Sequence, residues 1–164
     1  MDSYVECLIK AKGKGVWKFL KILLIMLTVV FGVLSLMGVI LLFVFAVACG
    51  IGAYVVGLRA ELEYEYLYLG KELTIDKIMA KTRRKRVGVF NLDSMEIVAP
   101  YRSYHLDNFR NRNVKELDYS IGEELKPDRR YVFYYEGSQK IIFSPSEEMV
   151  KAMKMAAPRK VFTE

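Results

Sequence analysis

The chain has few of the residues from which catalytic and metal sites are built. Its 164 residues include one histidine, His105, and two cysteines, Cys7 and Cys49. Because no cysteine follows Cys49, the sequence excludes a disulfide framework in the remaining part, as expected of a reducing compartment. His105 has no cysteine or serine partner at a recognisable spacing, so we expect a surface residue, with general acid–base catalysis as the alternative. The acidic residues lack metal-loop spacing and no glycine-rich phosphate loop occurs. We therefore expect no catalytic residue, no metal site, no cofactor and no enzyme.

Charge is absent from Ile22 to Leu58, a run of 37 residues (22 to 58). A helix needs about 20 residues to cross a bilayer. The run therefore predicts a transmembrane hairpin over residues 17–58, with spans near 17–36 and 38–58 and a turn within 35–38. A lipoprotein signal ending in a lipidated Cys49 is the alternative. It fits less well, because signal segments hold about 7–15 apolar residues and the chain stays apolar beyond Cys49.

Basic residues flank this apolar run at both ends. Five lysines precede it, Arg59 follows it, and the link between the spans carries no basic residue. Lys and Arg beside spans mark the cytoplasmic side of a membrane. The pattern predicts a two-span protein of the bacterial cell (inner) membrane with both termini in the cytoplasm. The five lysines are Lys10, Lys12, Lys14, Lys18 and Lys21.

Residues 1–16 are predicted to form a basic amphipathic segment. Ser3 to Glu6 has the capping-box pattern of a helix start, and Tyr4 and Leu8 then share one helical face. Such a segment could lie on an anionic leaflet, and a frayed tail with positive-inside lysines is the alternative. We expect Cys7 to be an inert thiol, with S-acylation as the other interpretation.

Small residues recur at four-residue spacing in the second span, a pattern that permits close helix packing, and the first span offers two small residues as packing partners. We expect packing within the hairpin, with dimerisation into a homo-oligomer as the alternative. No ionisable group lies inside the spans, which indicates an anchor rather than a transport or proton pathway. The predicted helix-packing residues are Gly32, Ser35, Ala46, Gly50 and Gly52.

Residues 59–164 are long enough for one domain with its own core and are predicted to be mainly β. Tyrosines alternate with glutamates early in this part; we expect them to pack in the core, with base stacking as the alternative. Ser144, Pro145 and Glu147 predict the start of a C-terminal helix that Pro158 terminates. The predicted strands are Glu61–Leu69, Leu73–Ala80, Val87–Phe90, Met95–Ala99, Val114–Tyr119, Tyr131–Tyr135 and Lys140–Phe143.

Five positive charges fall within six residues between the second and third predicted strands. Each charge near an anionic surface contributes about 1 kcal/mol, so the cluster could contact lipid headgroups or an acidic protein partner. A solvated turn that blunts a strand edge is an equal alternative, and nucleic acid is the weakest interpretation. The cluster consists of Lys81, Arg83, Arg84, Lys85 and Arg86.

Three segments carry a family resemblance: Glu63–Tyr66, Gly70–Ile78 and Arg83–Val87. With them, residues 62–157 resemble bacterial PH-like domains, in which seven strands precede one C-terminal helix. The whole chain resembles a family of small membrane proteins of Gram-positive (Firmicutes-type) bacteria. The resemblance implies a transmembrane hairpin followed by a mainly-β (α+β) PH-like barrel of about seven strands with a C-terminal helix. It implies no particular activity.

The function expected from these features is binding. The chain would be a membrane-anchored cytoplasmic scaffold. A sheet edge or the barrel mouth would contact a protein partner, and the basic cluster would face anionic phospholipid headgroups. The alternative is an accessory subunit of a larger membrane transport or secretion complex, whose spans would contact the small-residue helix faces. An enzyme acting on lipid would need a polar pocket at the membrane face, which the sequence does not show.

Overall fold

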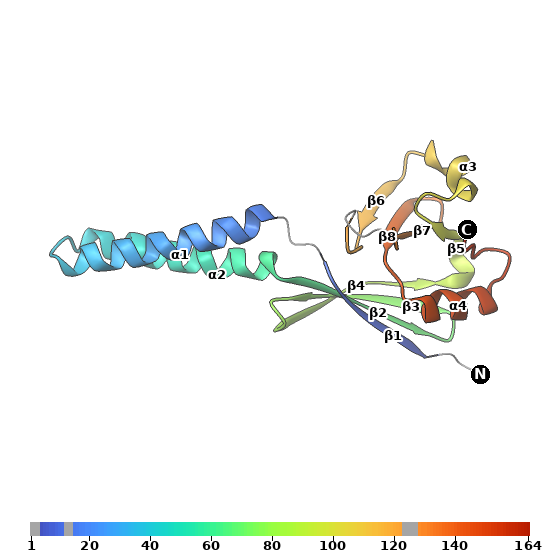
Figure 1. Ribbon diagram of the computed structural model, residues 1–164, viewed down its shortest axis with the longest axis horizontal. Helices are drawn as coiled ribbons and strands as arrows, with labels where there is room; N and C mark the ends of the chain where they lie inside the picture. Colours follow the sequence, from blue (N-terminus) through green and yellow to red (C-terminus); the bar gives the residue numbers. More distant parts are fainter. Residues whose placement is uncertain (1–3, 12–14, 123–127) are drawn as a thin grey trace. The chain divides into compact units, whose positions relative to one another are not determined.

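The computed structural model describes residues 4–11, 15–122 and 128–164 (Figure 1). The chain divides into two compact units. The helical unit comprises residues 12–62 together with the short segment 79–83. The β unit comprises residues 1–11, 63–78 and 84–164.

Two long apolar helices form the helical unit: α1 (Gly15–Leu36) and α2 (Leu41–Ala60). Their mean hydropathies are 2.6 and 2.4, and their lengths of 22 and 20 residues suffice to cross a membrane. The helices lie side by side and antiparallel (Figure 1), so the predicted hairpin is confirmed as a pair of candidate spans. The turn falls at residues 37–40 rather than 35–38. Gly38 takes a φ of +104° there, a conformation that glycine adopts without steric cost.

The first sheet has the strand order β1-β2-β3-β4. Its strands are β1 (Val5–Lys10), β2 (Leu62–Leu69), β3 (Glu72–Met79) and β4 (Arg83–Asn91). Strand β1 pairs antiparallel with β2, so that Cys7 lies opposite Tyr66 and Lys10 opposite Glu63. The two apolar helices are therefore an insertion between neighbouring strands of one sheet.

The amphipathic helix expected within residues 1–16 is wrong where the structure describes it. Val5–Lys10 is a strand, while Ser3 of the expected capping box lies outside the described residues. Strand periodicity puts Cys7 and Ile9 on the face that is shielded from solvent; Ile9 is 8% exposed, whereas Leu8 is 56% exposed. Pairing with β1 also satisfies the backbone groups that β2 would otherwise present at a sheet edge.

The second sheet has the strand order β5-β7-β8-β6. Its strands are β5 (Met95–Pro100), β6 (Lys115–Asp118), β7 (Tyr131–Tyr135) and β8 (Gln139–Phe143), and β6 runs parallel to β8. The short helical turn η1 (Leu92–Ser94) joins β4 of the first sheet to β5, while η2 (Tyr104–Leu106) and α3 (Asp107–Arg110) lie between β5 and β6. The described residues thus form eight strands in two separate sheets, and the expected barrel of about seven strands is not closed.

The core of the β unit is built from interlocking aromatic rings of both sheets. Edge-to-face pairs join Tyr66 to Phe143 at 5.8 Å and Phe90 to Phe133 at 5.2 Å between ring centres. The Tyr66 hydroxyl donates to the Tyr119 carbonyl at 2.6 Å and accepts from the Ser144 amide at 3.2 Å. Burial raises the pKa of Tyr66 well above its usual value. The alternating tyrosines therefore pack in the core. Tyr66 of the first sheet also forms hydrogen bonds with the backbone of Tyr119 and of Ser144, which follow strands β6 and β8 of the second sheet.

The C-terminal helix α4 (Glu147–Ala156) completes the β unit. It buries Met149 and Met153, as the apolar stripe predicts. The cap differs from the prediction: Ser146, not Ser144, accepts the amide hydrogen bond of Met149 at 3.2 Å. Ser144 instead accepts from the amide of Ile121, so its side chain joins two loops rather than starting the helix.

Candidate functional site: the charged rim of the helical hairpin

Aromatic and charged side chains gather where α1 begins and α2 ends. The Arg59 guanidinium lies 5.4 Å above the Trp17 ring, a cation–π contact. The Lys21 ammonium donates to the Glu61 carboxylate at 3.3 Å. The lysine side chain lies against α2 at Gly57, where an added Cβ would be 3.5 Å from Lys21 Cε, an ordinary contact. A tryptophan with basic neighbours at the end of an apolar helix is typical of a membrane–water interface.

The turn between β3 and β4 belongs to the same compact unit as these helix ends. The Ala80 amide donates to the Glu61 carbonyl at 2.7 Å, and the Thr82 amide closes the turn on the Met79 carbonyl at 3.2 Å. Ala80 and Lys81 both have positive φ, 48° and 57°, as the central residues of a type I′ hairpin turn do. The turn is thereby held beside the last residues of α2.

Two cations of the predicted cluster stand at this turn. Lys81 and Arg83 are exposed, and neither forms an ion pair with a residue that the structure describes. Together with the helix-end residues they make one charged surface, which we name the charged rim. The charged rim consists of Trp17, Lys21, Arg59, Glu61, Lys81 and Arg83.

The rest of the cluster lies along β4 in the β unit, and most of it is already paired. Asp76, 8% exposed, accepts from Arg84 Nε at 2.8 Å and from Arg86 Nε at 3.4 Å. Arg84 also forms an ion pair with Glu65 of β2. Lys85 is exposed and has no ion-pair partner among the described residues. The structure therefore separates the five basic residues: Arg84 and Arg86 tie three strands together, while the others keep free charge.

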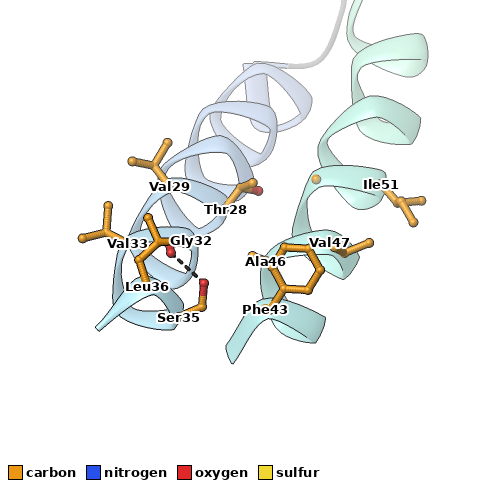
Figure 2. A pocket seen from close by; sticks show the side chains of 11 residues that line it. Thr28, Val29, Gly32, Val33, Ser35, Leu36, Phe43, Ala46, Val47 and Ile51 are labelled. Carbon is orange, nitrogen blue, oxygen red and sulfur yellow. Dashed lines mark hydrogen bonds between the residues drawn. The ribbon is translucent and has the colours of Figure 1, made fainter. Parts of the chain in front are cut away.

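The helix-packing residues predicted from the sequence come together only in part. Gly32, Ser35, Ala46 and Gly50 line an apolar groove of about 670 Å³ between α1 and α2 (Figure 2). A Cβ at Gly50 would meet Thr28 at 3.7 Å, whereas a Cβ at Gly32 would meet no atom within 4 Å. Gly50 thus serves packing within the hairpin, and Gly32 faces open space.

The remaining predicted packing residue, Gly52, lies away from this groove. A Cβ there would approach Leu24 at 3.6 Å, so Gly52 lets α2 approach another part of α1. The Ser35 hydroxyl donates to the Gly32 carbonyl of its own helix at 2.7 Å. Among the described residues, this intrahelical bond is the one that the Ser35 hydroxyl makes.

The other residues that the sequence analysis considered show no cluster suited to catalysis. Cys7 is half-buried, and burial raises the pKa of its thiol, which disfavours the reactive thiolate. The His105 ring stacks on the Phe162 ring, with 3.9 Å between ring centres. The centre of the Tyr104 ring lies 4.0 Å from that of His105. Among the described residues, no group of three His, Cys, Asp or Glu side chains could hold a metal ion.

Sequence reasoning missed two features. The contacts of Lys21 with Glu61 and of Arg59 with Trp17 join residues about forty positions apart, and local spacing does not reveal them. A second cavity was also missed, because its lining residues, among them Arg102 and Arg110, come from five segments of the chain. The turn at Ala80 carries no glycine or asparagine, so the usual hairpin signal was absent.

The fold combines two apolar helices, two β-sheets and a C-terminal helix. These elements fit a PH-like domain with an apolar helical hairpin. A family model described as "Bacterial PH-like domain (DUF6106)" matches residues 1–163. The match covers nearly the whole chain, including β1 and the helical hairpin, and the chain belongs to this family. Comparisons with curated proteins and with solved structures find no match.

Proposed function

We propose that the protein is a membrane-anchored binding module of the bacterial inner membrane. In this proposal α1 and α2 span the bilayer and both termini and the β unit are cytoplasmic. The lengths and hydropathies of the helices support the spans, and the basic residues at one end of the hairpin support the orientation. The proposed role is binding rather than catalysis.

The observation that carries this proposal is the charged rim. Trp17 and Arg59 occupy the helix ends as interface residues do, and the β3–β4 turn is hydrogen-bonded to Glu61. Lys81 and Arg83 are thereby held at the end of the proposed span, and neither forms an ion pair with another described residue. At the surface of an anionic leaflet each contributes about 1 kcal/mol of attraction. We infer that the rim binds phospholipid headgroups and fixes the β3–β4 turn at the bilayer.

Chain connectivity adds a second constraint. β1 ends at Lys10 and α1 begins at Gly15, while α2 ends at Ala60 and β2 begins at Leu62. Four intervening residues span at most about 18 Å when fully extended, and one residue spans less. Two short connections thus tether the β unit to the proposed spans, and its surfaces are available to a protein partner. We propose such a partner as the object that the module holds in place.

A second candidate function is that of an accessory subunit of a larger membrane complex. The open space at Gly32 favours it, because a small residue that nothing packs against leaves room for a neighbouring helix. A Gly32→Leu variant tests this role at a position where an added Cβ would meet no described atom within 4 Å. Loss of co-purifying membrane proteins in that variant would support the accessory role, and unchanged co-purification would leave the simple anchor.

The experiment that tests headgroup binding uses the full chain in lipid nanodiscs. A Thr82→Cys variant, in a Cys7→Ser and Cys49→Ser background, carries a polarity-sensitive dye on the β3–β4 turn. The emission of the dye reports the polarity around the turn. It is measured in neutral and in anionic bilayers across a salt titration. Anionic lipid should shift the emission toward the buried state, and salt should reverse the shift.

Matched charge variants decide the cause of any shift. Lys81→Gln with Arg83→Gln removes about 2 kcal/mol of attraction, about a 30-fold change in the ratio of docked to undocked turn. Lys151→Gln with Arg159→Gln removes two exposed charges elsewhere and should change nothing. An emission equal in neutral and anionic discs, or an equal loss in both double variants, would refute headgroup binding by the rim.

A further inference from the structure

The β unit contains a polar cavity that shares no residue with the charged rim. Its volume is about 440 Å³, which is within the range of small-molecule sites. Residues of the segment before α3 and of α3 itself form part of its wall, and β7 and β8 form the rest. We name it the arginine pocket. Its lining residues are Tyr101, Arg102, Leu106, Arg110, Val132, Tyr134 and Lys140.

The charge of the arginine pocket has one sign. Arg102, Arg110 and Lys140 line it, and none of the described lining residues is a carboxylate. Each cation has a carboxylate partner outside the lining: Arg102 Nε lies 3.7 Å from Asp128, Arg110 Nε 3.3 Å from Asp107, and Lys140 Nζ 2.8 Å from Glu116. A guanidinium has five N–H donors, so one carboxylate contact leaves most donors of each arginine available to a ligand.

A buried arginine fixes the aromatic wall of the pocket. Arg130, 6% exposed, lies with its guanidinium 3.9 Å from the Tyr101 ring centre. It also donates to both oxygens of Asp128, at 2.9 and 2.8 Å. Lys140 Nζ lies 5.8 Å from the same ring. Burial alone would lower the pKa of Lys140, but the hydrogen bond to Glu116 raises it overall, so this lysine stays charged at neutral pH.

We propose that the arginine pocket binds a small phosphate monoester that carries a ring. Arg102 and Arg110 line the cavity with N–H donors that their single carboxylate contacts leave available. The three terminal oxygens of a phosphate monoester accept more of these donors than the two oxygens of a carboxylate. Arginine forks bind phosphate oxygens in pairs, which adds directional hydrogen bonds to the charge attraction. The Tyr101 and Tyr134 rings, with Leu106 and Val132, provide an apolar wall for an organic ring. Inorganic phosphate would leave this wall without contact.

The test is calorimetric titration of the full chain in neutral, non-ionic micelles. Phenyl phosphate is the probe, and benzoate and inorganic phosphate are the comparison ligands. We expect phenyl phosphate to bind once per chain and at least tenfold more tightly than either comparison ligand. The absence of saturable binding up to millimolar concentration would overturn the proposal. Equal affinity for benzoate would overturn the phosphate assignment, and equal affinity for inorganic phosphate would overturn the ring.

Two arginine variants locate the binding. Arg102→Gln and Arg110→Gln should each weaken phenyl phosphate binding about 10- to 100-fold, as the loss of charge-assisted hydrogen bonds does. Both side chains are largely exposed, so the thermal midpoint of the protein should not change. Arg159→Gln removes an exposed charge that does not line the pocket and should bind as the wild type does. Undiminished binding in both pocket variants, or the same loss in Arg159→Gln, would overturn the proposal.

Discussion

Two adjacent residues of β1 give opposite predictions for the same substitution. Ile9 is 8% exposed and Leu8 is 56% exposed, because successive side chains of a strand point to opposite faces. Asparagine at position 9 loses the burial of an isoleucine side chain, about 2–3 kcal/mol. The substitution also buries a side-chain amide that has no hydrogen-bond partner, which costs about 1–3 kcal/mol more. We therefore expect Ile9→Asn to lower the free energy of unfolding by about 3–6 kcal/mol.

The matched control is Leu8→Asn, which places the same amide on the exposed face. It should cost no more than about 0.5 kcal/mol, as surface substitutions do. Had the segment been the amphipathic helix expected from its sequence, Leu8 would lie on the apolar face with Tyr4, and Leu8→Asn would be the disruptive change. The pair of variants therefore distinguishes a strand from a helix at these positions.

Pulse proteolysis of the full chain in non-ionic micelles across a urea series measures both variants. With a urea slope of about 1–3 kcal/mol per molar, the predicted loss moves the midpoint of Ile9→Asn downward by about 2 M. Leu8→Asn should unfold within a few tenths of a molar of the wild type. An equal shift in both variants, or a larger one for Leu8→Asn, would refute the insertion of the helical hairpin between β1 and β2.

Three further predictions follow from hydrogen bonding, titration and packing. Tyr66→Phe should cost about 1–3 kcal/mol of stability in the same urea assay, since two buried backbone groups lose their partner; an unchanged midpoint would contradict this. The side-chain hydrogen bonds from Arg130 hold the pKa of Asp128 below its usual value, so its stabilisation is present above the unfolded pKa of about 4 and disappears as pH falls through the folded pKa. The stability difference between wild type and Asp128→Asn should therefore shrink from pH 5 to pH 2 or thereabouts, and a constant difference would disprove it. Gly52→Leu should loosen the helical hairpin and speed its amide exchange, whereas Gly32→Leu should not, because only the first glycine faces the partner helix closely.

Much of the fold follows from local patterns in the sequence. The run without charge is long enough for two spans, and alternation predicts β2 to within one residue of its start at Leu62. The C-terminal helix follows from the spacing of Met149 and Met153, although Ser146 rather than Ser144 caps it. These elements are decided by residues close together in the chain.

The parts that could not be predicted depend on distant residues. Val5–Lys10 contains apolar residues at both helical and strand spacing, and its partner β2 lies beyond the whole helical hairpin. The charged rim likewise needs Glu61 to meet the Ala80 turn, and that turn uses non-glycine residues with positive φ. Because no short-range signal marks such contacts, the basic cluster could be located in the sequence but not divided into its paired and unpaired residues.

Cysteine labelling across the membrane tests the central claim, a membrane-spanning hairpin with the charged rim in the cytoplasm. Single-cysteine variants Val39→Cys, in the turn between α1 and α2, and Thr82→Cys, in the β3–β4 turn, would be made in the Cys7→Ser and Cys49→Ser background. An impermeant maleimide should label Val39→Cys from outside intact cells and Thr82→Cys only in inverted membrane vesicles. Labelling of both positions from the same side would contradict a spanning hairpin, and the reverse pattern would contradict the cytoplasmic placement.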